Sequence, residues 1–429
     1  MTKKTSQLSG FYKKERDERL NIIREWCNLT EDEVNALRGN MGLSLEQADH
    51  MIENVVGLYS LPFAIGTNFR INDIDYLIPM VVEEPSVVAA VSNAAKMFRA
   101  GGGFTSYSDY PNMIGQLQIL DINNLALASA NIKANEAQLI EEINTIGGSI
   151  IKRGGGAKRI EIHQYPDTKI GNMLVIHIIY DTQDAMGANA INTAAEHIAP
   201  KIEEMTGGRV NLRILSNLTD QRKAYAEGKI PKDKLARGNI SGEEAVDAII
   251  EAGVFAEIDP YRASTHNKGI MNGIDPVIIA TGNDWRAIEA GAHAYAARRG
   301  RYSSMTSWWK DTNGDLRGSI ELPLAVGTVG GATRVHPIAK IAMKILGHPN
   351  AQTLSEIIAC VGLAQNLGAI RALATEGIQQ GHMRMHARQL AVAAGAEGNQ
   401  VQVVAQQLIR ENNIRLQRAK EIIAEHTKE

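Results

Sequence analysis

Residues 173–189 read MLVIHIIYDTQDAMGAN. Within this stretch the spacing of apolar residues changes from that of a strand to that of a helix, and the expected fold follows from this change. Met173–Tyr180 is a nearly continuous apolar run of strand length, whereas the segment from Ala188 to about Met205 has the spacing of a helix. Gly187 opens that helix, where free backbone N–H groups favour an anion. The turn is consistent with a dinucleotide phosphate site and also with a simple helix cap, which is the commoner use of such a turn. The sequence contains no GxxxxGK[ST] or GxGxxG motif, which excludes a P-loop and an ordinary Rossmann fingerprint.

The segments around this stretch extend the pattern into a compact unit. A helix is expected at Ala134–Ile146, and the runs with strand composition are Met113–Leu120, Arg159–His163 and Val210–Leu215. Together with 173–189 they predict the order β-α-β-β-α-β, which is a split βαβ or ferredoxin-like unit. We therefore expect a small domain at residues 111–218 that is inserted into a larger one.

The chain on either side of this insertion is richer in helices. Capping boxes that begin at Thr30, Ser44 and Ser241 mark helix starts, because a hydroxyl and a carboxylate or amide satisfy free N–H groups there. Two strands around an Asn-Asp turn are expected within Leu58–Val82, and a long buried helix at Thr353–Leu373.

These patterns predict an α+β protein. Its helix-rich large domain would comprise residues 1–110 and 219–376, and its small domain residues 111–218. Gly377 and Gly381 interrupt the helical pattern before an amphipathic tail, so we expect a C-terminal helical flap at 377–429.

The bulk composition excludes several classes of protein. A chain of 429 residues with 44% hydrophobic and 22% charged residues is typical of a soluble globular protein with two or three domains. A formal net charge of −3 gives no reason to expect nucleic acid or an anionic membrane as partner. Cys27 and Cys360 are far apart in sequence, which favours a reducing cytoplasm over a disulfide framework. We expect neither a signal peptide nor a membrane span.

Lys268 lies in the segment DPYRASTHNKGIMNGID (residues 259–275), which is rich in glycine and asparagine. A lysine is most often a solvated surface residue, but Gly269 and Gly273 could let a ligand approach the backbone closely. A cation buried beside a carboxylate can stabilise the oxyanion that forms when a carbonyl is attacked. Asp284, in TGNDWR (residues 281–286), is the candidate partner.

Glu84 and His382 are candidate proton donors. An acid pair such as that in VEEPS (residues 82–86) usually serves solubility, but a desolvated carboxyl has a raised pKa and can donate a proton near neutral pH. His382 and His386 have the spacing of a helical metal pair, yet no third ligand follows at a zincin spacing, so we expect no metal. A histidine that begins a helix after two glycines suits a proton donor on a movable flap.

With these residues in view, the sequence resembles the 3-hydroxy-3-methylglutaryl-coenzyme A (HMG-CoA) reductases, and most closely the soluble class II form. The segments that carry the resemblance, in the family's order and spacing, are ENVVG (53–57), VEEPS, DAMGAN (184–189), RASTHNKGIMNGID (262–275), TGNDWR, GLAQNLGA (362–369) and GHM (381–383). The resemblance implies a four-electron reduction of HMG-CoA to mevalonate and free CoA with two NAD(P)H, or the reverse oxidation in mevalonate catabolism. Two alternatives are a CoA- or nucleotide-binding regulator without catalysis, and a related oxidoreductase acting on another hydroxyacyl thioester.

The resemblance also implies roles for individual residues. Lys268 would stabilise the oxyanion, Asp284 would hydrogen-bond that lysine, Glu84 would supply protons to the oxygen, and His382 would protonate the CoA thiolate. The cofactor-binding positions would be Asp184, Met186, Gly187, Asn189 and Thr193. The substrate-binding positions would be Ser86, Asn217, Arg262, Asn272 and Gln365, with Arg262 suited to the distal carboxylate.

Cofactor choice and assembly follow from the same resemblance. Relatives that prefer NADH carry an acid near the position of Gly147, and cations follow here at Lys152, Arg153, Lys158 and Arg159. NADPH, or use of both cofactors, is therefore favoured. The resemblance places the active site between two subunits of a homodimer or of a larger assembly of dimers. Tyr12, Lys13 and Lys14 are the candidates for contact with a CoA phosphate.

Overall fold

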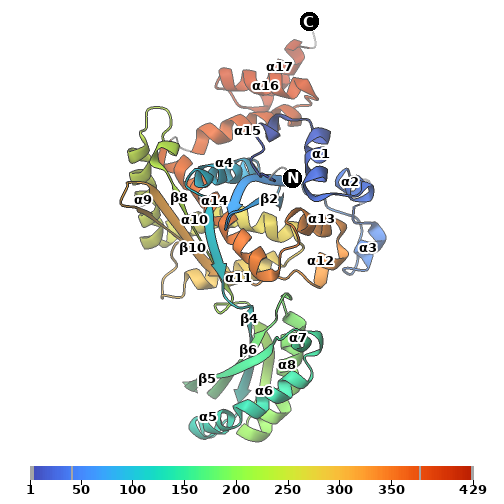
Figure 1. The fold of residues 1–429 in the computed structure, drawn as a ribbon, viewed down its shortest axis with the longest axis vertical. Helices are drawn as coiled ribbons and strands as arrows, with labels where there is room; N and C mark the ends of the chain where they lie inside the picture. Colours follow the sequence, from blue (N-terminus) through green and yellow to red (C-terminus); the bar gives the residue numbers. More distant parts are fainter. Residues whose placement is uncertain (1–3, 40–41, 376–377, 427–429) are drawn as a thin grey trace.

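The structure is a computed structural model that describes residues 4–39, 42–375 and 378–426, with the backbone alone for 378–385 and 426. A small unit, a large unit and a group of C-terminal helices follow one another along the long axis in Figure 1. The strands β3 (Phe104–Ser108) and β8 (Lys223–Ile230) precede and follow the small unit in sequence, yet they are paired neighbours in the large sheet. The small unit is therefore inserted between two neighbouring strands of the large sheet.

The large unit contains a six-stranded sheet with the order β2-β1-β3-β8-β10-β9. Its other strands are β1 (Phe63–Ile71), β2 (Ile74–Val81), β9 (Thr306–Lys310) and β10 (Leu316–Pro323). β1 and β2 form a hairpin around Asn72 and Asp73, which have φ angles of 48° and 64°. Two successive positive φ angles are what a tight hairpin turn requires. The predicted strand pair around an Asn-Asp turn is confirmed.

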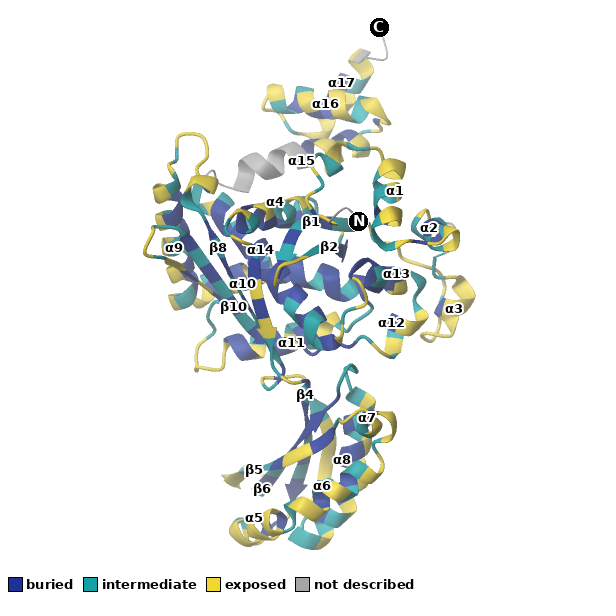
Figure 2. Cartoon of the chain, in the orientation of Figure 1, coloured by how far each residue is buried: buried dark blue, intermediate teal, exposed yellow. Residues whose placement is uncertain are grey.

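Helices pack around this sheet, and Figure 2 shows that their inward faces are buried. They are α1 (Arg16–Cys27), α2 (Glu31–Leu37), α3 (Leu45–Asp49), α4 (Val87–Ala100), α9 (Gly242–Ile258), α10 (Pro260–Ala280), α11 (Trp285–Ala296), α12 (Gly331–Val335), α13 (Pro337–Ile345) and α14 (Ala351–Thr375), with short 3-10 helices at Phe11–Lys13 and Lys232–Lys234. All three predicted capping boxes are present, at Thr30, Ser44 and Ser241, and they begin α2, α3 and α9.

The long helix α14 is the core element against which α10 and α4 pack. By length and composition alone it could cross a membrane. However, 72% of its apolar window is buried inside the protein, as expected for the core helix of a globular domain. Within residues 4–39, 42–375 and 378–426, no other helix meets the same criteria.

The small unit is a four-stranded antiparallel sheet with the order β5-β6-β4-β7. Its elements are β4 (Asn112–Leu120), α5 (Leu125–Ala134), α6 (Glu136–Thr145), α7 (Gly148–Lys152), β5 (Gly156–Thr168), β6 (Gly171–Asp181), α8 (Ala188–Thr206) and β7 (Arg209–Ser216). The predicted β-α-β-β-α-β order is present, and α6 is the helix expected at Ala134–Ile146; the helices on either side of it, α5 and α7, were not predicted. Asn135 separates α5 from α6, and its side chain donates to the carbonyl of Asn131 at 2.8 Å, which competes with a continuous helix.

The C-terminal helices α15 (Ile378–Ala393), α16 (Asn399–Arg410) and α17 (Leu416–His426) pack around an apolar cluster of their own. Ala391, Val404, Leu408 and Ile422 are buried in that cluster. In Figure 1 these helices lie beyond α4, at the end of the molecule opposite the small unit.

Candidate active site

Lys268 and Glu84 form an ion pair although they are far apart in the sequence. Lys268 lies in the middle of α10 and Glu84 in the loop between β2 and α4. The ammonium Nζ of Lys268 donates to Oε2 of Glu84 at 3.1 Å. Nδ2 of Asn272, one helical turn beyond Lys268, lies 3.5 Å from the same oxygen. The structure thus joins VEEPS to the lysine segment in one polar group.

The ion pair is open to solvent in the single chain. The side chain of Lys268 is 64% exposed and that of Glu84 is 35% exposed, so the expected burial of this cation is wrong for one chain alone. The neighbouring positions His266, Asn267 and Ile270 occupy the buried face of α10, and Lys268 therefore lies on its outer face. A developing oxyanion could reach the ammonium, but water can reach it too.

The polar residues next to Lys268 hold the helix in place. Nε2 of His266 lies 2.7 Å from the hydroxyl of Thr306 and 3.0 Å from the amide of Asn366. Asn267 donates to the carbonyl of Ser303 and accepts from a backbone N–H of the same loop. Burial lowers the pKa of His266 to about 3, so this ring stays neutral. These contacts fix α10 against the large sheet.

Gly273 serves helix packing, which corrects the expectation that it admits a ligand. A Cβ atom at Gly273 would lie 2.6 Å from Cβ of Gln365 on α14, so only glycine permits the observed contact between the two helices. At Gly269 the nearest atom to such a Cβ is 4.0 Å away, which is ordinary contact. The two glycines of this segment therefore differ in role.

A large cavity adjoins the ion pair. It has a volume of about 2210 Å³ and is lined by the VEEPS loop, the DAMGAN turn, the TGNDWR segment, the glycine-rich loop at 327–331 and residues before β1. Pockets for single small ligands have volumes of about 300–1,000 Å³. The cavity therefore has room for more than one ligand, or for one long ligand.

Ser86 and Asp284 both line this cavity. Ser86 precedes α4 with a φ of 76°, and its hydroxyl makes no capping bond to that helix. Asp284 caps α11 through the N–H groups of Arg286 and Ala287, and its second oxygen lies 3.1 Å from the guanidinium of Arg286. A positive φ at a non-glycine residue is strained, and such residues cluster at ligand sites.

Within one chain, Asp284 does not pair with Lys268. Lys268 and Ala280 lie twelve residues apart in the same helix, and Asp284 follows beyond its end. At the rise of an α-helix, those residues alone span about 18 Å. The hydrogen bond between Asp284 and Lys268 that the resemblance implies therefore requires a second chain or a large movement.

The DAMGAN turn has the form of an anion cradle. Gly187 has a φ of 93°, and a Cβ there would lie 2.2 Å from a methyl carbon of Thr182, so the turn requires glycine. No side chain caps the N-terminus of α8 at this residue, which leaves N–H groups for a ligand. Met186, Gly187 and Asn189 line the cavity.

The other two predicted cofactor residues, Asp184 and Thr193, do not line the cavity. Oδ1 of Asp184 accepts the backbone N–H of Ala351 at 2.9 Å, which caps α14, so its observed contact is structural. Thr193 is exposed on α8 and does not line the cavity.

Arg222 holds this turn and was missed in the sequence. It is only 4% exposed, and it donates to the hydroxyl of Thr182 at 2.9 Å, to the carbonyl of Ala185 at 3.1 Å and to the carbonyl of Val326. The loop at 327–331 adds a bond from Thr328 N–H to the carbonyl of Asp184 at 2.8 Å. An isolated arginine in the loop just before β8 carries no motif, so only the three-dimensional contacts reveal this role.

The remaining predicted substrate residues are dispersed. Arg262 is half-buried in the first turn of α10, where burial lowers its pKa, and it makes no ion pair with any side chain that the structure describes. Asn217 is exposed after β7. Gln365 is buried on α14, and its Oε1 has no hydrogen-bond partner in the described part of the chain. The side chain of His382 lies outside the described residues.

Curated proteins of known family are similar to this chain over most of its length. A protein from Archaeoglobus fulgidus named 3-hydroxy-3-methylglutaryl-coenzyme A reductase is 51% identical over 419 residues, which cover 98% of this chain and 94% of that protein. A probable reductase of the same name from Borreliella burgdorferi is 35% identical over 344 residues, which cover 80% and 77% of the two chains.

Solved structures agree with this relationship. The fold matches that of 3-hydroxy-3-methylglutaryl-coenzyme A reductase from Streptococcus pneumoniae with a TM-score of 0.83 and 41% identity, over 97% of this chain and 99% of that one. A second structure, described as the class II enzyme of the same organism bound to NADPH in open conformations, matches with a TM-score of 0.82 and 42% identity over 86% and 99%. The family model described as hydroxymethylglutaryl-coenzyme A reductase matches residues 15–387, and the chain belongs to that family.

Proposed function

We propose that this protein reduces HMG-CoA to mevalonate and free CoA, with NADPH as the reductant. The observation that carries the proposal is the Lys268–Glu84 ion pair beside a cavity that also contains the DAMGAN turn. Family membership supports the reaction. Bound NADPH would supply one hydride in each of two successive reductions of the same acyl carbon.

Lys268 and Glu84 have complementary roles in this reaction. The ammonium of Lys268 lies where it can stabilise the negative oxygen that forms when the carbonyl carbon accepts a hydride. In this ion pair Glu84 is a carboxylate, so it acts as a proton donor only after it has taken up a proton. Its Oε2, which contacts the same ammonium, can then give that proton to the oxygen and take it back as the hemithioacetal collapses. Collapse of the hemithioacetal then breaks the carbon–sulfur bond and releases the CoA thiolate. We assign protonation of that thiolate to His382.

The assignment of His382 has its own test. His382→Gln should slow reduction of the HMG thioester more than reduction of free mevaldehyde, because only the thioester expels a thiolate. Single-turnover rates on both substrates would measure the difference. Equal losses on the two substrates would remove this role from His382.

NADPH is favoured over NADH by the charges near α7. A Cβ at Gly147 would lie 2.3 Å from Ile151, so the acidic side chain of NADH-preferring relatives would not fit there without rearrangement. Lys152 and Arg153 are exposed beside Ile150, which lines the cavity, whereas Lys158 donates to the carbonyl of Gly154 and Arg159 pairs with Glu161. We assign the 2′-phosphate to Lys152 and Arg153.

This assignment predicts a change of cofactor preference. Replacing both Lys152 and Arg153 by glutamate should raise KM for NADPH and leave KM for NADH nearly unchanged, because only NADPH carries the additional phosphate. The matched control is Lys158→Glu, whose lysine is engaged by the backbone. An unchanged ratio of the two KM values in the double variant would refute the assignment.

We also propose that the active site forms between two copies of this chain. The open Lys268–Glu84 pair supports this, as do large exposed apolar residues on the neighbouring ends of α9 and α10: Val254, Phe255, Ile258 and Tyr261. Sedimentation over a range of protein concentrations would test it. A monomer that keeps full specific activity at every concentration would contradict it.

The remaining parts of the proposal concern location, domains and ligand contacts. A cytoplasmic location fits two free thiols, Cys27 and Cys360. We propose that residues 111–218 form the nucleotide-binding domain, residues 1–110 and 219–376 the substrate domain, and residues 377–429 the flap. Ser86, Asn217, Arg262, Asn272 and Gln365 remain the proposed contacts to the HMG group, and Asp184, Met186, Gly187, Asn189 and Thr193 those to the nucleotide.

Oxidation of NADPH upon addition of HMG-CoA is the primary test of the function. We expect loss of NADPH absorbance with two NADPH consumed per mevalonate formed. Tight binding of CoA or nucleotide without any oxidation would instead identify a regulator. Activity on another hydroxyacyl thioester in preference to HMG-CoA would identify the related oxidoreductase.

A further inference from the structure

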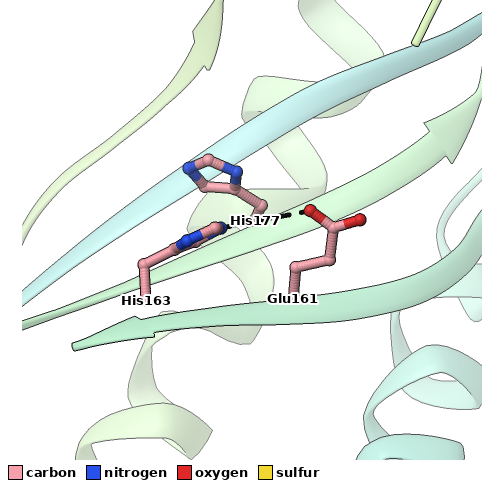
Figure 3. A group of neighbouring side chains, drawn as sticks. All are labelled: Glu161, His163 and His177. Atoms are coloured by element: carbon pink, nitrogen blue, oxygen red, sulfur yellow. Dashed lines mark ion pairs between the residues drawn. The ribbon is translucent and has the colours of Figure 1, made fainter.

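Three metal-ligating side chains gather on the small sheet, away from the cavity. Glu161 and His163 are two residues apart on β5, and His177 on β6 is in register with Glu161. Side chains two apart on a strand share one face, and residues paired across strands lie side by side on it. Figure 3 shows all three side chains projecting from these two neighbouring strands.

This face of the sheet is the one turned away from the core. Ile160, which precedes Glu161, and Ile176 and Ile178, which flank His177, are buried with the apolar residues of α8. The three candidate ligands are partly buried, and none of them lines the cavity described above. The cluster is therefore independent of the proposed nucleotide and substrate sites.

The contacts of each side chain leave ligand atoms available. Nε2 of His163 is buried, has no hydrogen-bond partner within the described residues, and lies 4.0 Å from Oε2 of Glu161. The other carboxylate oxygen of Glu161 is engaged by Arg159, at 2.8 Å and 3.1 Å, and by Gln221 at 3.2 Å. An unpartnered ring nitrogen thus faces a free carboxylate oxygen.

His177 completes the group from the other side. Its ring centroid lies 4.2 Å from that of His163, and Nε2 of the Gln116 amide on β4 lies 2.8 Å from Nε2 of this ring. An amide nitrogen can only donate, so metal binding by His177 requires the Gln116 amide to turn over. Its oxygen then accepts the ring Nε2–H, and Nδ1 is left for the ion. Glu161, His163 and His177 each offer one potential ligand atom, and these three atoms lie within 4.8 Å of one another. Partners that orient a ligating imidazole from behind are a usual feature of metal sites.

We propose that Glu161, His163 and His177 bind a divalent transition-metal ion of the zinc class. Two imidazoles and one carboxylate suit Zn²⁺ and its neighbours Co²⁺ and Ni²⁺, whereas Ca²⁺ and Mg²⁺ prefer oxygen ligands. Zinc–ligand bonds of roughly 2.0–2.2 Å place ligand atoms about 3.4 Å apart in a tetrahedral site. From 4.8 Å, the side chains would therefore have to close by up to about 1.4 Å, through rotation of their own bonds.

The protonation states match the forms that bind metal. Burial, together with the nearby His163, lowers the pKa of His177, so its imidazole is neutral near pH 7. Burial alone would raise the pKa of Glu161, but hydrogen bonds from Arg159 and Gln221 outweigh it and lower the pKa. Neutral imidazole and ionised carboxylate are the ligand forms, so His177 and Glu161 are each in the state that binds a metal ion.

The ion would bridge β5 and β6 and leave one coordination position for water. Equilibrium dialysis with Zn²⁺ on the untagged, metal-stripped protein should give one bound ion per chain. We expect His163→Gln and His177→Gln each to weaken Zn²⁺ binding at least tenfold. Loss of a residue that only supports a ligand typically costs about 10- to 100-fold in metal affinity, and loss of a ligand should cost no less. Co²⁺ should give a visible absorption band in the unaltered protein that both variants lack.

A matched control separates this site from adventitious surface binding. His197 is exposed on α8 in the same unit, so His197→Gln should leave Zn²⁺ binding unchanged. Circular dichroism and NADPH oxidation should be unchanged in all three variants, which excludes unfolding as the cause of lost binding. Zn²⁺ binding that survives the double variant His163→Gln/His177→Gln, or no stoichiometric binding by the unaltered protein, would overturn the proposal.

Discussion

The DAMGAN turn and the Lys268–Glu84 pair are built in different ways. Arg222, Thr328 and the N-terminus of α14 hold the turn with hydrogen bonds to atoms that are buried or partly buried. By contrast, Lys268 has one carboxylate partner and is 64% exposed. A single chain therefore completes the scaffold of the turn, whereas the pair that would carry the chemistry is left open. Changes in the two regions should accordingly alter different measured quantities.

The largest effect is expected at Lys268. Lys268→Ala removes the positive charge opposite the developing oxyanion, and loss of one such electrostatic donor typically costs 100- to 1000-fold in rate, or about 2.7–4 kcal/mol. Because Lys268 is exposed, the thermal midpoint should change little. The measurement is kcat with HMG-CoA together with a melting curve. Lys201→Ala, in which another helical lysine loses its glutamate partner Glu204, is the control and should keep its activity.

Substitution of Arg222 should lower stability and cofactor binding more than kcat, the reverse of what is expected for Lys268. Arg222→Met removes the donors to Thr182, Ala185 and Val326 and leaves buried acceptors unsatisfied, at about 1–3 kcal/mol for each such group. Stability should fall, and KM for NADPH should rise more than kcat falls, because the turn loses its support. Urea unfolding and steady-state kinetics would measure both. A variant with lowered kcat but unaltered KM and stability would contradict a positioning role.

The two glycines of α10 offer a matched pair. Gly273→Ala should destabilise the protein by about 1–3 kcal/mol through overpacking against Gln365. Gly269→Ala meets only ordinary contact, so it should be neutral or stabilising by up to about 1 kcal/mol through helix propensity. Equal unfolding free energies for the two variants would show that close packing of α10 on α14 does not fix the helix that carries Lys268.

The smallest effect is expected from Asp275, on the buried side of α10. Burial and the adjacent Glu289 carboxylate raise the pKa of Asp275, whereas Glu289, bonded to His293, has a lowered pKa. The neutral Asp275 contributes stability that is fully present below about pH 4, the pKa region of an unfolded aspartate, and is lost as pH rises through the raised pKa. Asp275→Asn should flatten this fall, which has a slope of at most about 1.4 kcal/mol per pH unit.

Unfolding free energies at a series of pH values would measure this slope. Asp247→Asn is the control, because that acid is exposed and paired with Lys310. Its slope should equal that of the unaltered protein. Identical slopes for all three proteins would mean that Asp275 is ionised in the folded state.

Local patterns were sufficient to predict much of the fold. The capping boxes at Thr30, Ser44 and Ser241, the Asn72-Asp73 hairpin and the β-α-β-β-α-β order depend on neighbouring residues, and all are present. The helix expected at Ala134–Ile146 is present as α6, whereas α5, on the other side of Asn135, and the five-residue helix α7 were not predicted. The long buried helix expected at Thr353–Leu373 is present as α14.

The site was less predictable than the fold because its contacts are distant in sequence. The motifs identified Lys268 and Glu84, but not that they contact each other. Whether Lys268 is buried depends on which face of α10 meets the core, and the segment around it is polar on both sides. The role of Arg222 depends on carbonyl groups brought together from residues 185 and 326, for which no local pattern exists.

The central proposal, an active site formed between two chains, would pair Lys268 of one chain with Asp284 of the other. Lys268→Ala and Asp284→Ala chains, each inactive alone, would be mixed under conditions of subunit exchange. If the two residues act across the interface of a dimer, half of the randomly mixed dimers contain one intact site, and activity should return to about a quarter of the unaltered level. If they act within one chain, every site carries a defect, and the mixture would stay inactive.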